Sequence, residues 1–191
     1  MKKVLVIVAH PDDETIWMGG TILENISKWD LTIISLCRKN DKDRAPKFKK
    51  VCKLFNARSF ISDLDDSEEG DYKKISEQEI IERIQKFADK EYDLIFTHGE
   101  NGEYGHIRHI EVHNTVEKMI KNEMLTCKQI FFFAYVRDGA YCAIDSNANK
   151  FINLDNFETI GKKRIIRKIY GFKKKSFEFG SANKQESFKT N

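Results

Sequence analysis

The chain alternates between continuous apolar runs and segments whose apolar residues recur every three or four positions. The run "KVLVIVAH" (3–10) is rich in β-branched residues and is typical of a strand buried on both faces of a sheet. Segment 44–57 instead places Phe48, Val51 and Phe55 at helical spacings, which predicts an amphipathic helix. By the same criteria we expect strands at 3–10, 31–37, 59–64, 92–98 and 129–136, and helices at 14–29, 44–57, 76–90 and 106–121.

This order of elements predicts one α/β domain over residues 1–191. Strands that alternate with helices form a Rossmann-like, mainly parallel sheet with helices on both faces. Crossovers in such sheets are right-handed, so the carboxyl ends of the strands lie along one edge. Ligands bind at that edge, near the point where the strand order reverses.

Histidines are concentrated at the ends of two predicted strands. The chain has five histidines, of which four lie within residues 98–113 and the fifth is His10 in "VAHPDDET". His10 ends the first strand and His98 ends the fourth. Both strands should therefore deliver polar side chains to the same edge, and we expect the two stretches to meet in space.

The residue types in these stretches match a catalytic metal site. Imidazole nitrogens and carboxylate oxygens are ligands of catalytic zinc, where three protein groups leave a fourth position for water. In a helix at 106–121, His106, His109 and His113 lie on one stripe, while "HPDDE" offers an imidazole and two carboxylates. A metal ion lowers the pKa of water from about 15.7 to about 7, which corresponds to about 12 kcal/mol in forming hydroxide. The pattern favours a metal hydrolase.

Simpler interpretations stay open for each motif taken alone. "PDD" is also typical of a turn that caps a helix, and His10 could be a hydrogen-bonded structural residue. His113 could simply line the core face of its helix, and His98 could likewise be a core residue. Two independent polar clusters at strand ends of one sheet favour the metal site. No G-x-G-x-x-G loop follows the first strand and no G-x-S-x-G elbow occurs, which argues against a dinucleotide-binding protein and a serine hydrolase.

Composition restricts the alternatives further. Hydrophobic residues make up 40% of the 191 residues and charged residues 33%, and the formal net charge of +3 is too small to indicate a nucleic-acid partner. Four cysteines without close spacing suggest neither disulfides nor a thiolate zinc site. The N-terminal apolar run is too short for a secretory signal or a membrane span. We therefore expect a cytoplasmic protein without an integral membrane segment.

Two motifs together resemble a known family. "AHPDDE" (9–14) and "GEYGHIRH" (102–109) are similar to motifs of the zinc-dependent de-N-acetylases, called LmbE-like or PIG-L-like. This family includes the phosphatidylinositol-glycan GlcNAc deacetylase and the mycothiol and bacillithiol pathway deacetylases. The resemblance spans nearly the whole chain, and it implies a single deacetylase domain over residues 1–191.

The resemblance also implies roles for individual residues. His10, Asp13 and His109 match the ligands of one zinc ion per chain. Asp12 matches the general base, and His106 matches the histidine that stabilises the oxyanion and can protonate the departing amine. The implied reaction is attack of a zinc-bound hydroxide on an acetamide carbonyl, which releases acetate and a free amine.

One position departs from the family pattern. Many relatives read H-P-D-H where this chain reads "HIRH" (106–109), and their acidic residue can hold the neighbouring histidine. Arg108 cannot do this. Either another carboxylate takes its place, or His106 acts as a neutral donor to the oxyanion. We hypothesise that Arg108 reaches an anionic part of the substrate.

Few residues indicate the substrate. Arg44 matches a family position that touches the sugar, although a solvated helix start would also explain it. Glu103 and Tyr104, in the glycine-rich loop 99–105, are expected to line the pocket mouth. Because the family's usual substrates contain N-acetylglucosamine, we expect a small-molecule or glycoconjugate substrate with an N-acetylated amino sugar. Its phosphate or lipid carrier and the oligomeric state stay open.

Two other functions compete with this expectation. The chain could be a metal-dependent amidase for a non-sugar acetamide, or a non-catalytic sugar-binding module, although the intact "HPDD" motif argues against the latter. The C-terminal segment 162–175 contains eight basic residues among fourteen. It could be a solvated face, or it could bind a sugar phosphate, a lipid-linked sugar or an anionic membrane.

Overall fold

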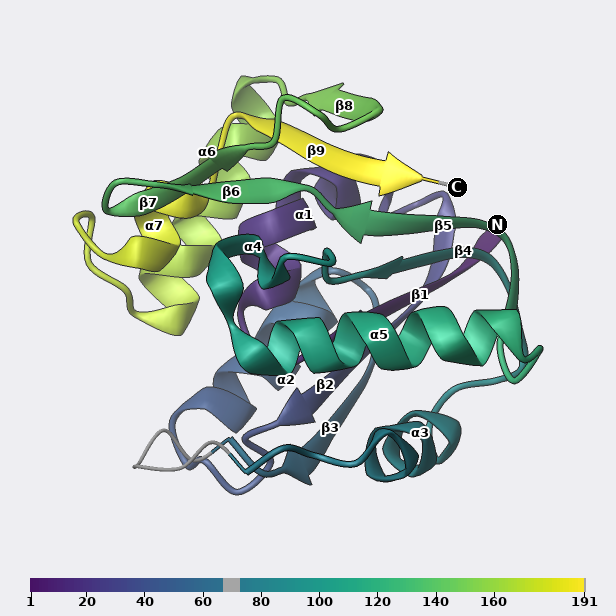
Figure 1. The fold of residues 1–191 in the computed structure, drawn as a ribbon. Helices are drawn as coiled ribbons and strands as arrows, with labels where there is room; N and C mark the ends of the chain where they lie inside the picture. Colours follow the sequence, from purple (N-terminus) through teal and green to yellow (C-terminus); the bar gives the residue numbers. More distant parts are fainter. Residues whose placement is uncertain (67–72, 191) are drawn as a thin grey trace.

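In the computed structural model, which describes residues 1–66 and 73–190, a seven-stranded sheet lies between two layers of helices (Figure 1). The strands run in the order β3-β2-β1-β4-β5-β9-β8. The first five are parallel, and β9 is antiparallel to both β5 and β8. The expected mainly parallel α/β sheet is thus confirmed. The strands are β1 (Lys2–Val8), β2 (Trp29–Cys37), β3 (Arg58–Leu64), β4 (Glu91–Thr97), β5 (Thr126–Phe133), β8 (Lys150–Asn153) and β9 (Gln185–Thr190).

Helices cover both faces of the sheet because its central strands are apolar on both sides. In β1, Val4 and Val6 pack into one core while Leu5 and Ile7 pack into the other, as the twofold alternation of a strand requires. The first core is closed by α1 (Asp13–Asn25), α2 (Arg44–Leu54) and α6 (Asn156–Ile165), and the second by α3 (Glu77–Gln85) and α5 (Ile107–Lys121).

Several short elements were not expected from the sequence. The predicted strand 129–136 is two strands, because β5 ends at Phe133 and β6 (Tyr135–Asp138) leaves the sheet to form a hairpin with β7 (Tyr141–Ile144). The glycine-rich loop contains the single turn α4 (Gly102–Gly105), and a π-helical turn η1 (Ile166–Tyr170) and α7 (Phe177–Ser181) follow α6. These elements are too short to show a hydrophobic period.

The strand order reverses next to β1, which pairs with β2 on one side and with β4 on the other. Such a switch point opens a crevice at the carboxyl ends of the two strands. His10 follows β1 and His98 follows β4, so the expected convergence of the two motifs is confirmed. The two motifs therefore meet at the edge of the sheet where α/β proteins bind ligands.

A buried ion pair fastens the C-terminal segment to α1. The side chains of Lys162 and Glu186 are both fully buried, with Nζ 2.7 Å from Oε1. Glu186 also accepts hydrogen bonds from the backbone N–H groups of Gly20 and Thr21 in α1. A Cβ at Gly20 would lie 2.2 Å from the side chain of Leu154, so this close approach requires glycine. One of the eight basic residues of segment 162–175 is therefore structural.

Within the described parts of the chain, no helix has the length and apolar character needed to cross a bilayer.

Candidate functional site

The three predicted metal ligands converge at the switch point. Nδ1 of His10 lies 3.2 Å from Nε2 of His109 and 3.3 Å from Oδ2 of Asp13. Nε2 of His109 lies 3.4 Å from the same oxygen of Asp13. The three atoms form a nearly equilateral triangle, although their residues come from the end of β1, the start of α1 and the first turn of α5.

This triangle has the dimensions of one face of a tetrahedral zinc site. Nitrogen and oxygen ligands lie about 2.0–2.2 Å from zinc, so two ligands of a tetrahedral ion are about 3.3–3.5 Å apart. The donor set of two imidazoles and one carboxylate also suits zinc. The residues present therefore fit the ion that the motifs predict.

Hydrogen bonds at the opposite nitrogens orient both histidines. Nε2 of His10 lies 2.9 Å from Oδ1 of Asp66, and Nδ1 of His109 lies 2.5 Å from Oε2 of Glu103. Each carboxylate can take the N–H of its histidine, which leaves the other ring nitrogen as a ligand. The sequence gave no indication that Asp66 or Glu103 orients a histidine, and Glu103 was expected at the pocket mouth. The only signal at either position was an acidic residue shortly after a strand.

The third ligand is oriented as well. Asp13 accepts hydrogen bonds from Nε1 of Trp17 at Oδ1 and from the backbone N–H of His10 at Oδ2. Burial opposes ionisation of Asp13, but the charge of His109 and hydrogen bonds from His10 and His109 hold its pKa well below the usual value. Asp13 is thus an anion held in one orientation, as a metal ligand requires.

The surrounding charges favour a bound cation. Burial acts to lower the pKa of His109, yet the charges of Asp13 and Glu103 raise it to about 10. Burial acts to raise the pKa of Glu103, yet the charges of His98 and His109 lower it to about 2. The buried carboxylates of Asp13 and Glu103 therefore create a negative potential at His109, and this potential would also attract a metal cation.

Two looser groupings of possible ligands are less suitable. Nε2 of His98 lies 3.5 Å from Asp13, but it already accepts the backbone N–H of Ala9 at 2.9 Å. Ligand atoms of His106 lie only within 4.8 Å of those of His10 and His109. His98 instead joins the ends of β1 and β4, which agrees with its interpretation as a structural residue.

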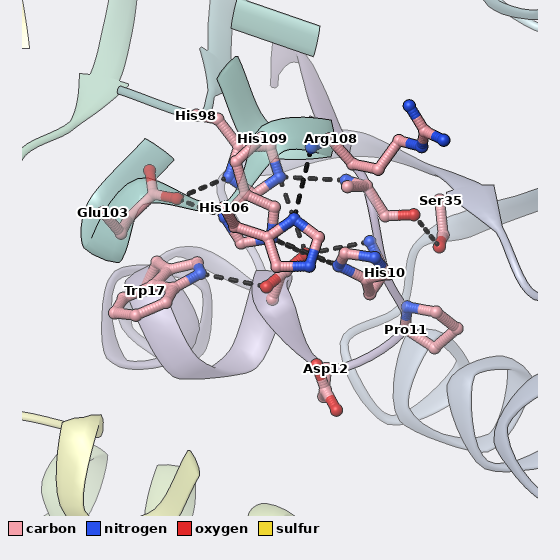
Figure 2. A network of polar contacts seen from close by, with 12 residues as sticks. His10, Pro11, Asp12, Trp17, Ser35, His98, Glu103, His106, Arg108 and His109 are labelled. Carbon is pink, nitrogen blue, oxygen red and sulfur yellow. Dashed lines mark hydrogen bonds and ion pairs between the residues drawn. The ribbon is translucent and has the colours of Figure 1, made fainter. Parts of the chain in front are cut away.

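Asp12 lies beside the triangle without joining it. Figure 2 shows its carboxylate turned away from the histidine rings, and it forms an ion pair with Nη1 of Arg44. Burial and the negative charge of Asp13 raise the pKa of Asp12 well above its usual value, against the opposing charge of Arg44. A carboxylate that stays off the metal and binds protons more tightly than usual is suited to act as a base.

The backbone of Asp12 is held in an unusual conformation. Its φ of 110° is rare for a residue with a side chain and is costly unless the surroundings enforce it. Its N–H donates to Oε2 of Glu14, whose Oε1 accepts from the hydroxyls of Thr15 at 2.6 Å and Tyr170 at 2.7 Å. Tyr170 ends the π-helical turn η1, so the C-terminal segment supports Asp12 through Glu14. The sequence contained no signal for this contact.

His106 is the N-cap residue of α5. Its Nδ1 accepts the backbone N–H of Arg108 at 3.2 Å, so its Nε2 is the nitrogen that carries the proton. Burial, together with the charges of His109 and His10, lowers the pKa of His106 to about 3. Of the two roles left open for His106, a neutral hydrogen-bond donor is the one that agrees with this environment.

A cavity of about 110 Å³ opens beside the triangle. Arg44 and Tyr104 line it, but Glu103 and Arg108 do not. Glu103 is fully buried beneath His109, which corrects the expectation that it lies at the pocket mouth. The lining residues are His10, Asp12, Asp13, Ile16, Trp17, Arg38, Arg44, Tyr104, His106, Phe177 and Glu178.

Arg108 points away from the cavity, which corrects the hypothesis that it reaches the substrate (Figure 2). It is fully buried and forms an ion pair of 2.5 Å with Glu111. It also donates to the backbone carbonyls of Asp65 and Lys73. Arg108 therefore anchors the chain on either side of residues 67–72 to α5. His113, bonded to the carbonyl of His98 at 2.9 Å, is likewise structural.

The sequence is similar to one family model and to a viral protein. Residues 5–120 match the model of the PIG-L family, described as GlcNAc-PI de-N-acetylase. The uncharacterized protein L374 of Acanthamoeba polyphaga mimivirus is 28% identical over 132 residues, which are 61% of this chain and 55% of that protein. The chain thus spans about half the length of this curated relative.

Solved structures share the fold over most of the chain. The N,N'-diacetylchitobiose deacetylase of Pyrococcus horikoshii has a TM-score of 0.64 at 16% identity, covering 90% of this chain and 71% of that one. The A40926 pseudoaglycone deacetylase has a TM-score of 0.63 at 11% identity, covering 100% and 97%. The 4-carboxy-2-hydroxymuconate hydratase of Pseudomonas putida KT2440 has a TM-score of 0.59 at 12% identity, covering 87% and 78%. At these identities the likeness establishes the fold alone.

Proposed function

The chain belongs to the PIG-L family, described as GlcNAc-PI de-N-acetylase, and from this premise we propose that it is a zinc-dependent N-deacetylase of N-acetylated amino sugars. The observation that carries the proposal is the triangle of ligand atoms from His10, Asp13 and His109, with Asp12 beside it and not part of it. A base next to a three-ligand metal site is the arrangement that amide hydrolysis by water needs.

The metal and the protein would divide the chemistry between them. His10, Asp13 and His109 would hold zinc, which would supply a Lewis acid able to activate water and the acetamide carbonyl. Asp12 accepts the proton of the attacking water, for which its raised pKa is suited. Nε2–H of His106 donates to the oxygen that becomes negative as the carbonyl is attacked. Asp12 then returns its proton to the departing amine, and acetate is released.

The cavity walls suit a sugar that carries an acetamide. Tyr104 and Phe177, whose ring centroids are 4.8 Å apart, form an aromatic wall, and the fully buried Trp17 lies behind it with its ring 6.5 Å from each of them. Such a wall can pack against the apolar face of a pyranose ring. Arg44 and Glu178 add polar groups that can bind hydroxyls. We therefore propose an N-acetylglucosamine-type substrate, which is also consistent with the fold shared with a diacetylchitobiose deacetylase.

The test combines metal content with acetate release. Wild type, Asp12→Asn and the control Asp30→Asn, which changes an exposed aspartate of β2, are loaded with zinc. They are then assayed on N-acetylglucosamine, UDP-N-acetylglucosamine and N,N'-diacetylchitobiose. We expect one zinc per chain in all three proteins, acetate release by wild type and Asp30→Asn, and at least a hundredfold loss in Asp12→Asn.

Other outcomes would overturn specific parts of the proposal. If the wild-type protein binds no zinc, the proposed zinc centre is absent. Acetate release from simple N-acetylated amines but from none of the sugars would identify an amidase of non-sugar substrates. Zinc binding with sugar binding but without acetate release would identify a non-catalytic sugar-binding module.

A further inference from the structure

The outer face of the C-terminal helix combines apolar and basic side chains. Phe157 and Ile160 are 74% and 66% exposed, which is unusual for large apolar residues. Arg164, Arg167 and Lys168 follow Ile160 at successive spacings of four, three and one and are also exposed. Because residues three and four apart share one side of a helix, these five side chains form a single stripe on α6 and η1, here called the α6–η1 face.

The positive charge of this region is not neutralised locally. Segment 162–175 contains no acidic residue, and the exposed bases of the α6–η1 face are followed by exposed Lys173, Lys174 and Lys175. Within residues 1–66 and 73–190, these six basic side chains form no ion pair. At the N-terminus of α6, the N-cap residue Asp155 and Glu158 bond each other in a capping box. The charge is therefore available to an external partner.

Two apolar grooves flank the helix beneath the basic side chains. One, of about 380 Å³, is lined by Leu23, Leu54, Ile165 and Ile169 and also by Arg164 and Lys168. The other, of about 400 Å³, is lined by Ile160 and Phe179 among other residues and shares the same two basic residues. The surface thus offers apolar area and cationic groups side by side.

We propose that the α6–η1 face docks this protein onto an anionic phospholipid surface. Such a surface is complementary to both features, since its headgroups are negative and the acyl boundary just below them accepts apolar side chains. Phe157 and Ile160 insert at this boundary, while the six exposed bases bind headgroup phosphates. The long stems of Arg and Lys can lie along the apolar grooves while their charged ends stay with the headgroups.

Docking in this orientation would keep the candidate site close to the bilayer. Lys173–Lys175 lead directly into α7, whose Phe177 and Glu178 line the cavity. The inference goes beyond the proposed deacetylase function and does not depend on it, because lipid binding is measured without a substrate.

The test is sedimentation of the purified protein with vesicles. We expect wild type to bind vesicles of phosphatidylcholine with about 30% phosphatidylserine, to bind pure phosphatidylcholine hardly at all, and to lose binding as salt rises. Charge reversal by Arg164→Glu, Arg167→Glu and Lys168→Glu together should weaken binding at least a hundredfold. Removal of the apolar anchors by Phe157→Ser with Ile160→Ser should weaken it at least tenfold.

Matched controls separate docking from net charge and from general hydrophobicity. Lys86→Glu, Lys90→Glu and Lys121→Glu together change the net charge equally at exposed sites outside the C-terminal segment. Met124→Ser with Val136→Ser removes two other exposed apolar side chains. Both controls should bind vesicles within about twofold of wild type, and circular dichroism with thermal unfolding verifies that every variant is folded.

Three results would overturn the proposal. The first is absence of binding to anionic vesicles at millimolar lipid. The second is equal loss of binding in the charge-matched control, since this would reduce the effect to net charge. The third is a wild-type dimer in sedimentation velocity that Phe157→Ser with Ile160→Ser converts to a monomer, which would make this face a contact between two copies of the chain.

Discussion

Glu103 accepts a hydrogen bond from Nδ1 of His109 at 2.5 Å, and this contact directs Nε2 of His109 toward His10 and Asp13. The same carboxylate lies 3.0 Å from Nδ1 of His98 and accepts the N–H of Gly99 at 2.8 Å. Glu103 is thereby held in place by the loop after β4. The orientation of the candidate zinc ligand thus depends on a residue that cannot touch the metal.

Replacing Glu103 should weaken zinc binding. In Glu103→Ala, His109 loses the partner that selects its tautomer and fixes its ring, so we expect zinc affinity to fall about 10- to 100-fold. Competition with a fluorescent chelator measures this. Glu100→Ala changes an exposed glutamate of the same loop and should leave the affinity unchanged. Equal zinc affinity in wild type and Glu103→Ala would show that this hydrogen bond does not support the ligand.

Zinc affinity should also rise with pH. Burial opposes protonation of His109, but the charges of Asp13 and Glu103 raise its pKa to about 10, so the metal-free site holds a proton at neutral pH. Zinc must displace this proton, and a higher pH makes the displacement easier. Chelator competition between about pH 6 and pH 8 should give about a tenfold gain per unit. An affinity that stays constant over this interval would contradict the protonated state.

Loss of one hydroxyl behind Asp12 should slow the reaction. Tyr170→Phe removes a donor to Glu14, which holds the N–H of Asp12, and so loosens the strained backbone of the base. We expect kcat on the best acetamide substrate to fall about tenfold, which corresponds to about 1.4 kcal/mol, with KM and zinc content unchanged. Tyr141→Phe, at an exposed tyrosine of β7, serves as the control.

The same substitution can be tested in the Asp12→Asn background. If Tyr170 acts through the base, Tyr170→Phe should cause no further loss there. Additive losses in the double variant would indicate that Tyr170 contributes by some other route.

Replacing Arg108 should affect stability and not substrate binding. Arg108→Ala leaves Glu111 and two backbone carbonyls without their partner, and the removal of one member of a largely buried pair costs about 3 kcal/mol. We expect urea unfolding to show this loss while KM stays at the wild-type value. A raised KM with unchanged stability would instead support direct contact between Arg108 and the substrate.

Much of the fold follows from local patterns. The continuous β-branched run of β1 predicts a strand that is buried on both faces. The helical spacing of apolar residues in α2 predicts a helix that buries one face. The short β6–β9 strands carry too few residues to show a period. Their pairing depends on the antiparallel partner that the folded chain supplies.

In the candidate site, too, some residues could be identified from the sequence and the roles of others could not. His10, Asp13 and His109 could be proposed from two motifs at strand ends, since parallel strands bring their carboxyl ends to one edge. The roles of Glu103 and Arg108 were misjudged, because charged residues are usually exposed and no local pattern indicates that they are buried. Their positions are explained by contacts made in the folded chain, among them those of Glu103 with His109 and of Arg108 with Glu111.

The sequence by itself determined the fold class, the edge of the sheet that carries the site and the residue types available to a metal ion. Hydrophobic period and motif spacing are local properties, and local properties can be read along the chain. Tertiary structure decided which nitrogen of each histidine faces the other candidate ligands, which carboxylates orient the rings, and that Asp12 pairs with Arg44 outside the triangle. It also decided that Tyr170, more than 150 residues from Asp12, supports the backbone of Asp12 through Glu14. These choices depend on contacts between distant segments, and such contacts exist only after the chain has folded.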